Sequence, residues 1–509
     1  MNVDHIGVIG GGTAGYFAAI ALKRARPERR VTLVESSKIP IIGVGEATTP
    51  PMLPFLHHVL GIDVIDFYAR VKPTWKLGIK FEWGPRPYFN YPFGDAQLVD
   101  AVVHDGDVRS CSLTSRLMAR DRVPLFEDVL GADSALAKVR FAYHLDNRRF
   151  VAYLAEHARR EGVEYLDRTV AGAVVADAGR VDHLATQEGD ALRFDLYIDA
   201  TGFRSLLIEG ALGSPYLPYD STLLCDRAVV ANVPHGGLLK PYTLAETMDA
   251  GWCWNIPQVD EDHRGYVYSS AFLDVDAAAA EMRRKNPGMS DYWTVKFRSG
   301  RHRDFWLGNV VAVGNAYGFV EPLESTALHM VILEVLSLSA ELDRRRRDGG
   351  EPDRARLNRL CGERWDYLRW FLGLHYRFNA RLDTPFWQEC RRRVDVSGLD
   401  EWLARYRAAG PLTAQGVAKD ERDAVFGPRG FDVMLLGQEV PCPLPAPATP
   451  ADAWRRRRAA EQSLVDRALP QARALDFLAG RPDLLVDAVA APGSWCAAGG
   501  DELRALDAS

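Results

Sequence analysis

The N-terminal residues 5–37 constrain the fold of this chain more than any other segment. Their sequence, HIGVIGGGTAGYFAAIALKRARPERRVTLVESS, has the pattern of a buried strand, a glycine turn, an amphipathic helix from about Thr13 and a second strand. Gly10, Gly12 and Gly15 have the G-x-G-x-x-G spacing. Such glycines allow a tight bend, close approach of backbone N–H groups to a pyrophosphate, and close helix–strand packing. The segment predicts a Rossmann-type dinucleotide-binding unit.

An acidic residue at the end of the second strand supports this prediction. Glu35 follows Gly15 by 20 residues, where a carboxylate can bind the ribose hydroxyls of the dinucleotide. Thr13 and Ala14 begin the helix whose N-terminus would face the pyrophosphate. A glycine turn can also occur without a ligand, but the flanking strands and the spaced acid favour binding. Both NAD and FAD fit these features.

Two later segments have the pattern of a strand followed by a glycine turn. They are RFDLYIDATGFRS (193–205) and GNVVAVGNAYGFVEPLESTALHMVILEVLSLSAEL (308–342). A chain that returns twice to an N-terminal Rossmann unit resembles the FAD-containing monooxygenase superfamily. The resemblance implies an α/β protein with a FAD-binding Rossmann-type fold, a mixed-sheet substrate region and a helical C-terminal region. Gly314-Asn315 departs from the Gly-Asp that hydroxylases of that superfamily usually have.

Five further motifs follow the glycine turn in an order that makes the resemblance more specific. They are GVGEATTP, TWKLGIKF, GWCWNIP, EPLEST and DTPFW, which begin at residues 43, 74, 251, 321 and 383. From residue 1 to about residue 390, the chain resembles the flavin-dependent halogenases of the tryptophan halogenase family, whose signature is W-x-W-x-I-P. The resemblance implies FAD (as FADH2), O2, and chloride or bromide, with a separate flavin reductase as partner. It also adds Glu46 and Ala47 to the expected cofactor-binding residues.

Trp252 and Trp254 are one residue apart in the motif GWCWNIP. In an extended segment their rings point to the same face, and such a stripe usually fills a core. Pro257 argues against a long central strand, because proline cannot donate a ladder hydrogen bond. The resemblance gives the two tryptophans a further role, as a barrier beside the flavin that keeps the organic substrate away from it.

Lys76 and Glu324 are the catalytic residues that the resemblance implies. Lys76 would deliver the electrophilic halogen, either by hydrogen-bonding hypohalous acid or as a haloamine, and partial desolvation would tune its charge. Glu324 would orient the oxidant, or stabilise the arenium ion and accept its proton. The simpler alternatives are a surface lysine whose amine reaches water, for which Lys80 is the better candidate, and an acid that interacts with a helix dipole.

Ser325 and Thr326 are the halide-binding residues that the resemblance implies. They precede a long helix, whose first N–H groups and dipole favour an anion. Without the resemblance, the two residues fit an ordinary helix N-cap. Ala327 stands where the family usually has glycine. Because alanine does not readily adopt positive φ, this loop is expected to be altered.

Tyr91 and Phe93 in RPYFNYPFG match the family segment that sandwiches the indole of free tryptophan. Phe93 keeps the aromatic platform, and Tyr91 replaces an expected histidine. The stretch 421–450, ERDAVFGPRGFDVMLLGQEVPCPLPAPATP, lacks the aromatic cluster that holds the amino-acid backbone in free-tryptophan members. The ammonium and carboxylate groups would lose hydration there without partners. We therefore expect a peptide-embedded tryptophan, ahead of another indole, a pyrrole, a phenol or free tryptophan.

Two other functions are compatible with the same fold. An aromatic hydroxylase that uses NAD(P)H would form its product without halide, although no second nicotinamide-binding G-x-G-x-x-G unit is visible. A flavin-binding or peptide-docking protein without activity would use Lys76 and Glu324 only structurally. Replacing Lys76 by alanine distinguishes the last alternative, because only a halogenase would lose product while FAD binding is retained.

The chain has 509 residues, more than one hydrophobic core usually supports. Residues 1–345 are expected to form a FAD-binding lobe, with substrate-binding segments interleaved at about 71–145 and 206–295. Residues 346–509 are expected to form a mainly helical substrate or lid region. Within it, PCPLPAPATP (441–450) has the composition of an extended linker.

Charge and cysteine usage argue against several classes of function. The formal net charge of −6 gives no general attraction to nucleic acid or an anionic membrane, and Arg344–Arg347 and Arg455–Arg458 fit solvated helix ends. The seven cysteines include no C-x-x-C pair, so neither a metal site nor a disulfide framework is expected. No export signal and no apolar stretch of roughly 18 residues is visible, which predicts a cytoplasmic protein. Monomer and homodimer both fit the sequence.

Overall fold

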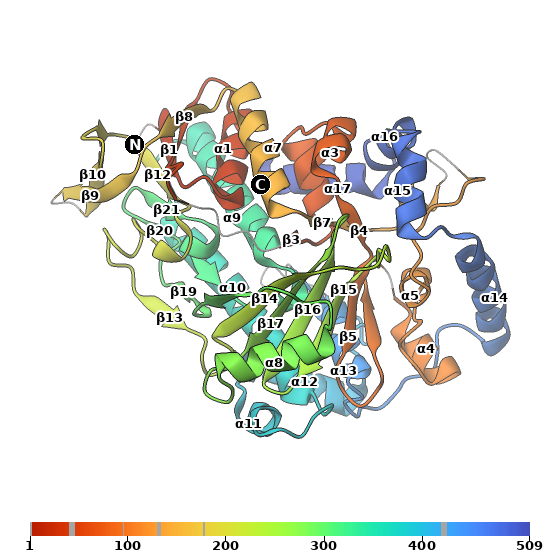
Figure 1. The fold of residues 1–509 in the computed structure, drawn as a ribbon. Helices are drawn as coiled ribbons and strands as arrows, with labels where there is room; N and C mark the ends of the chain where they lie inside the picture. The colour runs from red at the N-terminus through yellow and green to blue at the C-terminus, as the bar shows by residue number, and fades with distance from the viewer. Residues whose placement is uncertain are drawn as a thin grey trace.

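A six-stranded sheet forms the N-terminal layer of the molecule (Figure 1). The computed structural model describes residues 3–39, 46–94, 96–129, 134–176, 179–418 and 425–508. Neighbouring strands of the sheet are parallel except at one edge, where β20 and β21 are antiparallel. In sheet order, the strands are β20 (Trp306–Leu307), β21 (Val310–Ala312), β12 (Leu196–Asp199), β1 (His5–Ile9), β2 (Arg30–Glu35) and β8 (Glu164–Asp167).

The strand, glycine turn, helix and second strand predicted at the N-terminus are present as β1, α1 and β2. A Cβ atom on Gly15 would lie 1.9 Å from the carbonyl oxygen of Gly10, so only glycine lets the helix approach this turn. Helix α1 contacts two other helices of this layer and both strands. The predicted FAD-binding Rossmann-type α/β fold is confirmed. The three helices are α1 (Thr13–Ala25), α7 (Asn147–Arg160) and α9 (Ala327–Asp348).

A seven-stranded mixed sheet forms the second layer, and GWCWNIP is one of its inner strands. Only β5 and β15 are parallel in this sheet. As expected for a proline, Pro257 is the last residue of this strand, which does not continue beyond it. In sheet order, the strands are β18 (Trp293–Lys296), β14 (Arg227–Val233), β17 (Asp262–Tyr268), β16 (Gly251–Pro257), β15 (Thr243–Met248), β5 (Gly78–Glu82) and β6 (Phe89–Pro92).

A small antiparallel sheet joins two of the sequence motifs. Strand β7 (Ala142–Leu145) pairs on one side with β3 (Glu46–Ala47) and on the other with β4 (Thr74–Lys76). The end of GVGEATTP and the start of TWKLGIKF are therefore held in register by one strand. The remaining strands form two three-stranded sheets, β11 (Ala191–Leu192), β10 (Arg180–Thr186) and β9 (Val170–Ala176), and β13 (Tyr216–Pro218), β19 (Gly300–His302) and β22 (Gly318–Phe319).

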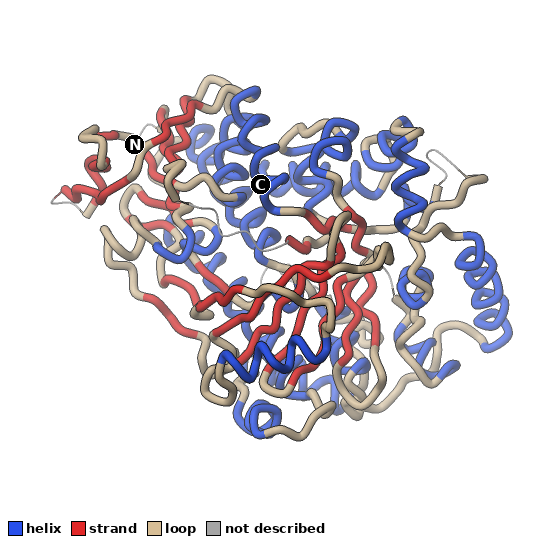
Figure 2. The backbone as a smooth tube through the Cα atoms, in the orientation of Figure 1, coloured by secondary structure: helices blue, strands red, loops and turns tan. Residues whose placement is uncertain are grey.

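Helices predominate after α9, as Figure 2 shows by colour. One of them returns to the N-terminal layer: α17 packs against α9 and the π-helix η1 (Phe55–Val59). These helices are α10 (Arg354–Phe378), α11 (Pro385–Arg393), α12 (Asp400–Ala409), α13 (Gly427–Gly437), α14 (Ala451–Arg467), α15 (Gln471–Ala479), α16 (Asp483–Val489) and α17 (Trp495–Ala508). The earlier ones are α2 (Met52–Pro54), α3 (Val64–Val71), α4 (Leu98–Asp105), α5 (Leu113–Ala119), α6 (Ala135–Lys138) and α8 (Val275–Lys285).

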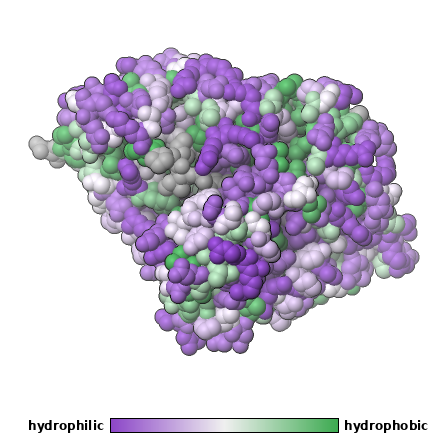
Figure 3. Space-filling view, in the orientation of Figure 1, coloured by the Kyte–Doolittle hydropathy of each residue, from purple (hydrophilic) through white to green (hydrophobic). Residues whose placement is uncertain are grey.

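Within the described ranges, no helix combines the length and the apolar character needed to cross a bilayer. The face of the molecule in Figure 3 is mainly hydrophilic, with small hydrophobic areas scattered over it.

Candidate active site

The glycine turn after β1 is shaped to receive a phosphate group. A Cβ atom on Gly12 would meet no atom within 4 Å, whereas a Cβ on Gly10 would lie 2.3 Å from the carbonyl oxygen of Ala200. Gly12 is the N-cap of α1, and no side chain caps the first N–H groups of this helix. These features fit the pyrophosphate of a dinucleotide such as FAD.

A cavity of about 280 Å³ lies beside Glu35. The Tyr16 hydroxyl donates a hydrogen bond to Glu35 Oε1 at 3.1 Å and fixes this carboxylate at the end of β2. A carboxylate in this place can accept hydrogen bonds from ribose hydroxyls. The cavity is lined by Tyr16, Glu35, Asn147, Arg148, Val151, Ala152 and Ala155.

The other residues expected at the cofactor lie around the start of α1 and at β3. The Thr13 hydroxyl faces Asn147 Oδ1 at 3.4 Å. A Cβ atom on Gly314 would lie 2.9 Å from Cβ of Ala14, so the third glycine turn packs directly against this helix start. Glu46 and Ala47 form β3, and loss of hydration raises the pKa of Glu46 to about 7. Gly43 to Gly45 of GVGEATTP lie outside the described residues.

Two buried carboxyl groups hold the later glycine turns. Asp199, at the end of β12, accepts hydrogen bonds from the backbone N–H groups of Thr201, Leu207 and Ile208. Glu334 of α9 accepts a hydrogen bond from the Gly314 N–H at 2.8 Å, and burial raises its pKa to about 8. The turn that carries Asn315 instead of the family's aspartate is thus anchored by a carboxyl group from α9.

Lys76 is completely buried at the end of β4, so it is not a surface lysine. Its Nζ donates a hydrogen bond to Ser325 Oγ at 2.7 Å and lies 5.4 Å from the centre of the Phe93 ring. Burial lowers the pKa of Lys76 to about 7, although the nearby Glu324 carboxylate opposes this shift. Lys80 is only half-buried, and its amine donates to the Tyr242 hydroxyl. Near neutral pH, Lys76 can therefore act both as an ammonium and as a free amine.

The segment before α9 presents the two residues expected to bind halide. Ser325 has a φ of 58°, an uncommon conformation for a residue with a side chain, whereas Ala327 is the first residue of the helix. The positive φ in this loop therefore belongs to Ser325. Thr326 is the N-cap but its side chain makes no capping hydrogen bond. Its Oγ1 is buried and has no hydrogen-bond partner among the described residues.

Glu324 lies against a histidine that was not predicted. Its Oε1 is 2.7 Å from Nε2 of His375 in α10, and both side chains are almost completely excluded from water. Glu324 belongs to the short 3₁₀ helix η5 (Pro322–Glu324), and the next residue, Ser325, binds Lys76. This segment therefore brings an amine, a carboxyl group, a hydroxyl and an imidazole together.

The tryptophans of β16 are buried, and Trp252 is hydrogen-bonded to the segment that precedes η5. Their ring centres are 6.0 Å apart. The Trp252 N–H donates to Glu321 Oε2 at 2.6 Å, and the Tyr376 hydroxyl donates to the same oxygen. Trp254 stacks on His263 and its N–H donates to that ring at 3.2 Å. Burial raises the pKa of Glu321 to about 7. Because Glu321 precedes η5, one short segment contacts both Trp252 and Lys76.

Tyr91 and Phe93, the two aromatic residues expected to receive the substrate, lie near Glu324 and Lys76. Tyr91 and Phe93 come from β6 and the residue after it. Tyr91 contacts Phe426 edge to face at 6.1 Å, and Phe426 stacks on Phe371 at 4.1 Å. Phe426 belongs to the stretch in which the usual aromatic cluster is missing. The stretch that lacks the usual aromatic cluster therefore contributes Phe426, which contacts Tyr91 and Phe371.

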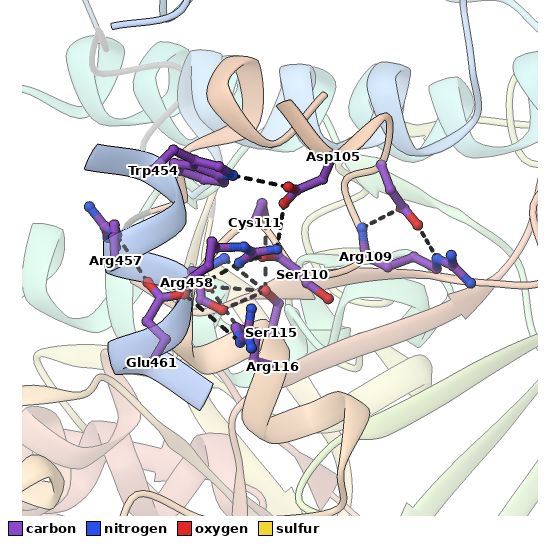
Figure 4. Close-up of polar contacts among 12 residues, drawn as sticks. Asp105, Arg109, Ser110, Cys111, Ser115, Arg116, Trp454, Arg457, Arg458 and Glu461 are labelled. Atoms are coloured by element: carbon purple, nitrogen blue, oxygen red, sulfur yellow. Dashed lines mark hydrogen bonds and ion pairs between the residues drawn. The ribbon is translucent and has the colours of Figure 1, made fainter. Parts of the chain in front are cut away.

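One of the arginine runs behaves differently from the expectation of a solvated helix end. Arg458 of α14 donates to Asp105 at 2.7 Å and lies 3.3 Å from Glu461 (Figure 4). Its side chain is only 16% exposed, so the expectation was wrong for this residue, whereas Arg455 is 72% exposed. A cavity of about 550 Å³ lies here, lined by Asp105, Asp107, Ser110, Arg116, Trp454, Arg455 and Arg458.

The family model for tryptophan halogenase matches residues 5–452. The chain belongs to the tryptophan halogenase family. It is 32% identical over 445 residues to 7-chloro-L-tryptophan 6-halogenase KtzR of Kutzneria sp. (strain 744), with coverage of 80% of this chain and 85% of KtzR. It is 30% identical over 464 residues to tryptophan 7-halogenase RebH of Lentzea aerocolonigenes, with coverage of 84% and 86%.

Solved halogenase structures share the fold over nearly the whole chain. This member of the tryptophan halogenase family has a TM-score of 0.91 and 48% identity with MibH, a lanthipeptide tryptophan 5-halogenase, with 97% of each chain covered. For BrvH, a flavin-dependent halogenase from Brevundimonas sp. BAL3, the TM-score is 0.82 and the identity 29%, with coverage of 94% of this chain and 99% of BrvH.

Three residues that help to build the site were not predicted: Glu321, His375 and Phe426. Glu321 is in the quoted motif EPLEST, but the sequence does not show that its partner is Trp252. His375 interrupts the apolar run FLGLHYRF of a helix, and a polar residue in such a run is the signal that could have found it. Nothing in the sequence around Phe426 indicates that it stacks on α10.

Proposed function

We propose that this protein halogenates the indole ring of a tryptophan within a peptide. Its family makes it a flavin-dependent aryl halogenase, which uses FADH2, O2 and halide. The observation that carries the proposal is the buried amine of Lys76, which donates to Ser325 beside the unpartnered hydroxyl of Thr326. An amine whose pKa is close to 7, together with a hydroxyl that has no hydrogen-bond partner among the described residues, suits the handling of an electrophilic halogen.

The glycine turn and the cavity beside Glu35 are the proposed cofactor site. Gly10, Gly12 and Gly15 would hold the pyrophosphate at the start of α1, and Glu35 would bind ribose. Glu46 of β3 would also contact the cofactor. When bound, FADH2 supplies with O2 the oxidising power that converts halide into hypohalous acid, and a separate flavin reductase regenerates it. The protein contributes binding, orientation and exclusion of water.

The start of α9 is the proposed halide site. The hydroxyl of Thr326 has no partner within the described ranges, and the first N–H groups of the helix point in the direction that favours an anion. Ser325 is held in its left-handed conformation with its hydroxyl on Lys76. Consecutive residues of one loop thereby supply the proposed halide-binding hydroxyl of Thr326 and the Ser325 hydroxyl that accepts a hydrogen bond from the Lys76 amine.

Lys76 and Glu324 are the proposed catalytic residues for transfer to the substrate. The Lys76 ammonium donates a hydrogen bond to hypohalous acid, or its free amine carries the halogen to the ring. Glu324 then accepts the proton that the substituted ring carbon loses. The low pKa of Lys76 supports both forms of the amine near neutral pH. Trp252 and Trp254 would keep the indole of the substrate from the flavin.

A peptide substrate is favoured by the groups around the proposed pocket and by relatedness. The stretch 421–450 lacks the aromatic cluster that holds the amino-acid backbone in free-tryptophan members, so the ammonium and carboxylate of the free amino acid would lose hydration there without partners. Tyr91, Phe93 and Phe426 offer aromatic surface for an indole. The identity with the lanthipeptide halogenase MibH is 48%, against 30% with RebH.

A direct competition between substrates tests this proposal. The enzyme is supplied with FAD, NADH, a flavin reductase, O2 and either chloride or bromide, and is given equal concentrations of free tryptophan and of a tryptophan-containing peptide. We expect mass spectrometry to show one halogen in the peptide and little in the amino acid. Faster halogenation of free tryptophan than of every peptide offered would refute the substrate assignment.

A further inference from the structure

Glu324 and His375 form a buried contact in which both ring nitrogens of the histidine have a protein partner. Nε2 of His375 lies 2.7 Å from Glu324 Oε1, and Nδ1 of the same ring lies 3.0 Å from the backbone carbonyl oxygen of Phe371. His375 is fully buried and Glu324 is 2% exposed. Both ring nitrogens are therefore engaged by protein atoms and shielded from water.

Proton counting determines the state of the imidazole. A carbonyl oxygen can only accept a hydrogen bond, so Nδ1 must carry a hydrogen to bind Phe371. In the neutral ring, Nε2 is then an unprotonated acceptor. Facing a carboxylate oxygen, it would place two acceptors 2.7 Å apart without a hydrogen between them. The contact is favourable only when one proton lies between Nε2 and Oε1.

One proton is therefore retained by the pair of Glu324 and His375. It belongs either to an imidazolium that donates to a carboxylate, or to a carboxylic acid that donates to a neutral imidazole. In both arrangements Oε1 is occupied by the histidine. Among the residues that the structure describes, Oε2 of Glu324 has no hydrogen-bond partner, so this oxygen is the one available to substrate.

The surroundings of the pair leave few other groups that can exchange this proton. Around His375 the nearby rings of Phe81, Trp83 and Phe371 are not ionisable. The ionisable groups that act on Glu324 are Lys76 of β4 and Tyr91 of β6. The guanidinium of Arg429 on α13 in turn acts electrostatically on the Tyr91 hydroxyl.

We propose that His375 is a positioning residue that makes Glu324 an effective proton acceptor in the halogenation. The inference rests on the proposed function. In the step, the C–H bond of the halogenated ring carbon breaks, its electron pair returns to the ring, and Oε2 takes the proton. The other proton stays on, or moves to, Nε2 of His375, so Oε1 remains hydrogen-bonded throughout. After product leaves, the pair returns one proton to water.

The test uses two substitutions of His375 that distinguish the packing of its ring from its ability to take up a proton. His375→Phe keeps an aromatic ring among its neighbours but leaves Glu324 without a partner. His375→Gln can place an amide N–H near Oε1, but it cannot take up a proton. The matched control is His157→Gln in α7, because His157 is also buried and its Nε2 contacts a backbone oxygen at 2.8 Å, outside the proposed site.

With a tryptophan-containing peptide, we expect kcat to fall about 100-fold in both variants, the low end of general-base effects. KM and FAD affinity should change little in His375→Gln. When the ring hydrogen at the halogenated position is replaced by deuterium, both variants should show a primary isotope effect that is larger than in the parent enzyme. A structural role alone would lower the amount of folded enzyme without raising this isotope effect. Parent-like kcat in both variants would overturn the proposal.

A second measurement does not depend on turnover. Nitrogen-15 NMR of histidine-labelled protein should show His375 with Nδ1 protonated, and Glu324→Gln should shift its Nε2 resonance. An Nδ1 without hydrogen would overturn the inference even in an active enzyme. Absence of halogenated product in the parent protein would instead refute the proposed function, and the NMR result would still decide the proton on His375.

Discussion

Two groups of charged residues in this molecule use positive charge in opposite ways. In the lysine site, Lys76 is fully buried and its hydrogen-bond partner is the neutral hydroxyl of Ser325. In the α14 network, Arg458 lies between the carboxylates of Asp105 and Glu461 and is partly open to water. The network compensates its charge, whereas the lysine site leaves the amine close to neutrality. Arg458, which is paired with two carboxylates, connects α14 to α4, whereas the Lys76 amine, whose hydrogen-bond partner is a hydroxyl, is available for chemistry.

Removal of the amine should have the largest effect. We expect Lys76→Ala to lose halogenated product by about 1,000-fold or more, because no other described group at the site can carry the halogen. FAD binding should be unchanged, since the glycine turn lies in another layer. Product is measured by mass spectrometry and FAD affinity by flavin fluorescence. A variant that keeps more than a tenth of the parent activity would remove Lys76 from the mechanism.

The second largest effect is expected in protein stability, because burying the Lys76 amine costs free energy of folding. The pKa of Lys76 falls from 10.5 in water to about 7, so between these pH values the unfolded chain binds more protons than the folded one. Stability of the parent protein should therefore rise with pH through this window. Lys76→Met should be more stable by a few kcal/mol near pH 7 and lose this advantage toward pH 10.5. Urea unfolding across the window measures both, and parallel pH profiles would contradict the account.

The α14 network should respond in stability rather than in activity. Arg458→Ala leaves Asp105 and Glu461 without their shared partner, and we expect a loss of about 2 kcal/mol. Activity per folded molecule should be unchanged. Arg455→Ala is the control, because its exposed side chain should contribute less than about 0.5 kcal/mol. Equal losses from both substitutions, measured by thermal unfolding, would show that the network is not the source of the stability.

The halide site should show the smallest effect. Thr326→Val keeps the shape of the side chain but removes the buried hydroxyl, and we expect the KM for bromide or chloride to rise about tenfold, the value of one hydrogen bond to a charged group. Because the hydroxyl has no partner in the described parts of the chain, stability should not fall. Initial rates at varied halide concentration measure the effect. An unchanged halide KM would place the anion elsewhere.

Much of the fold was predictable because its signals are local. The G-x-G-x-x-G turn, its flanking strands and Glu35 lie within one continuous segment, and their physical roles follow from that spacing. Lys76 could be named from a motif, but its burial and its hydrogen bond to Ser325 depend on residues that are far apart in the sequence. Long-range packing decides such contacts, and no local pattern contains it.

Three other parts of the chain show the same limit. Pro257 marks the end of β16, but it does not show that this strand lies between β17 and β15. The Arg455–Arg458 run looks uniform in sequence, but the Arg458 side chain reaches Asp105 and is 16% exposed, whereas the Arg455 side chain is 72% exposed. His375 and Glu324 are 51 residues apart and meet only after α10 packs against η5.

The measurement that tests the central claim most directly is product formation under ¹⁸O2 with and without halide. The claim is that halogen, and not flavin-derived oxygen, reaches the substrate at Lys76. We expect a peptide whose tryptophan has exchanged one hydrogen for chlorine or bromine, without ¹⁸O, and no product when halide is removed. A peptide that gains ¹⁸O in the absence of halide would contradict this claim.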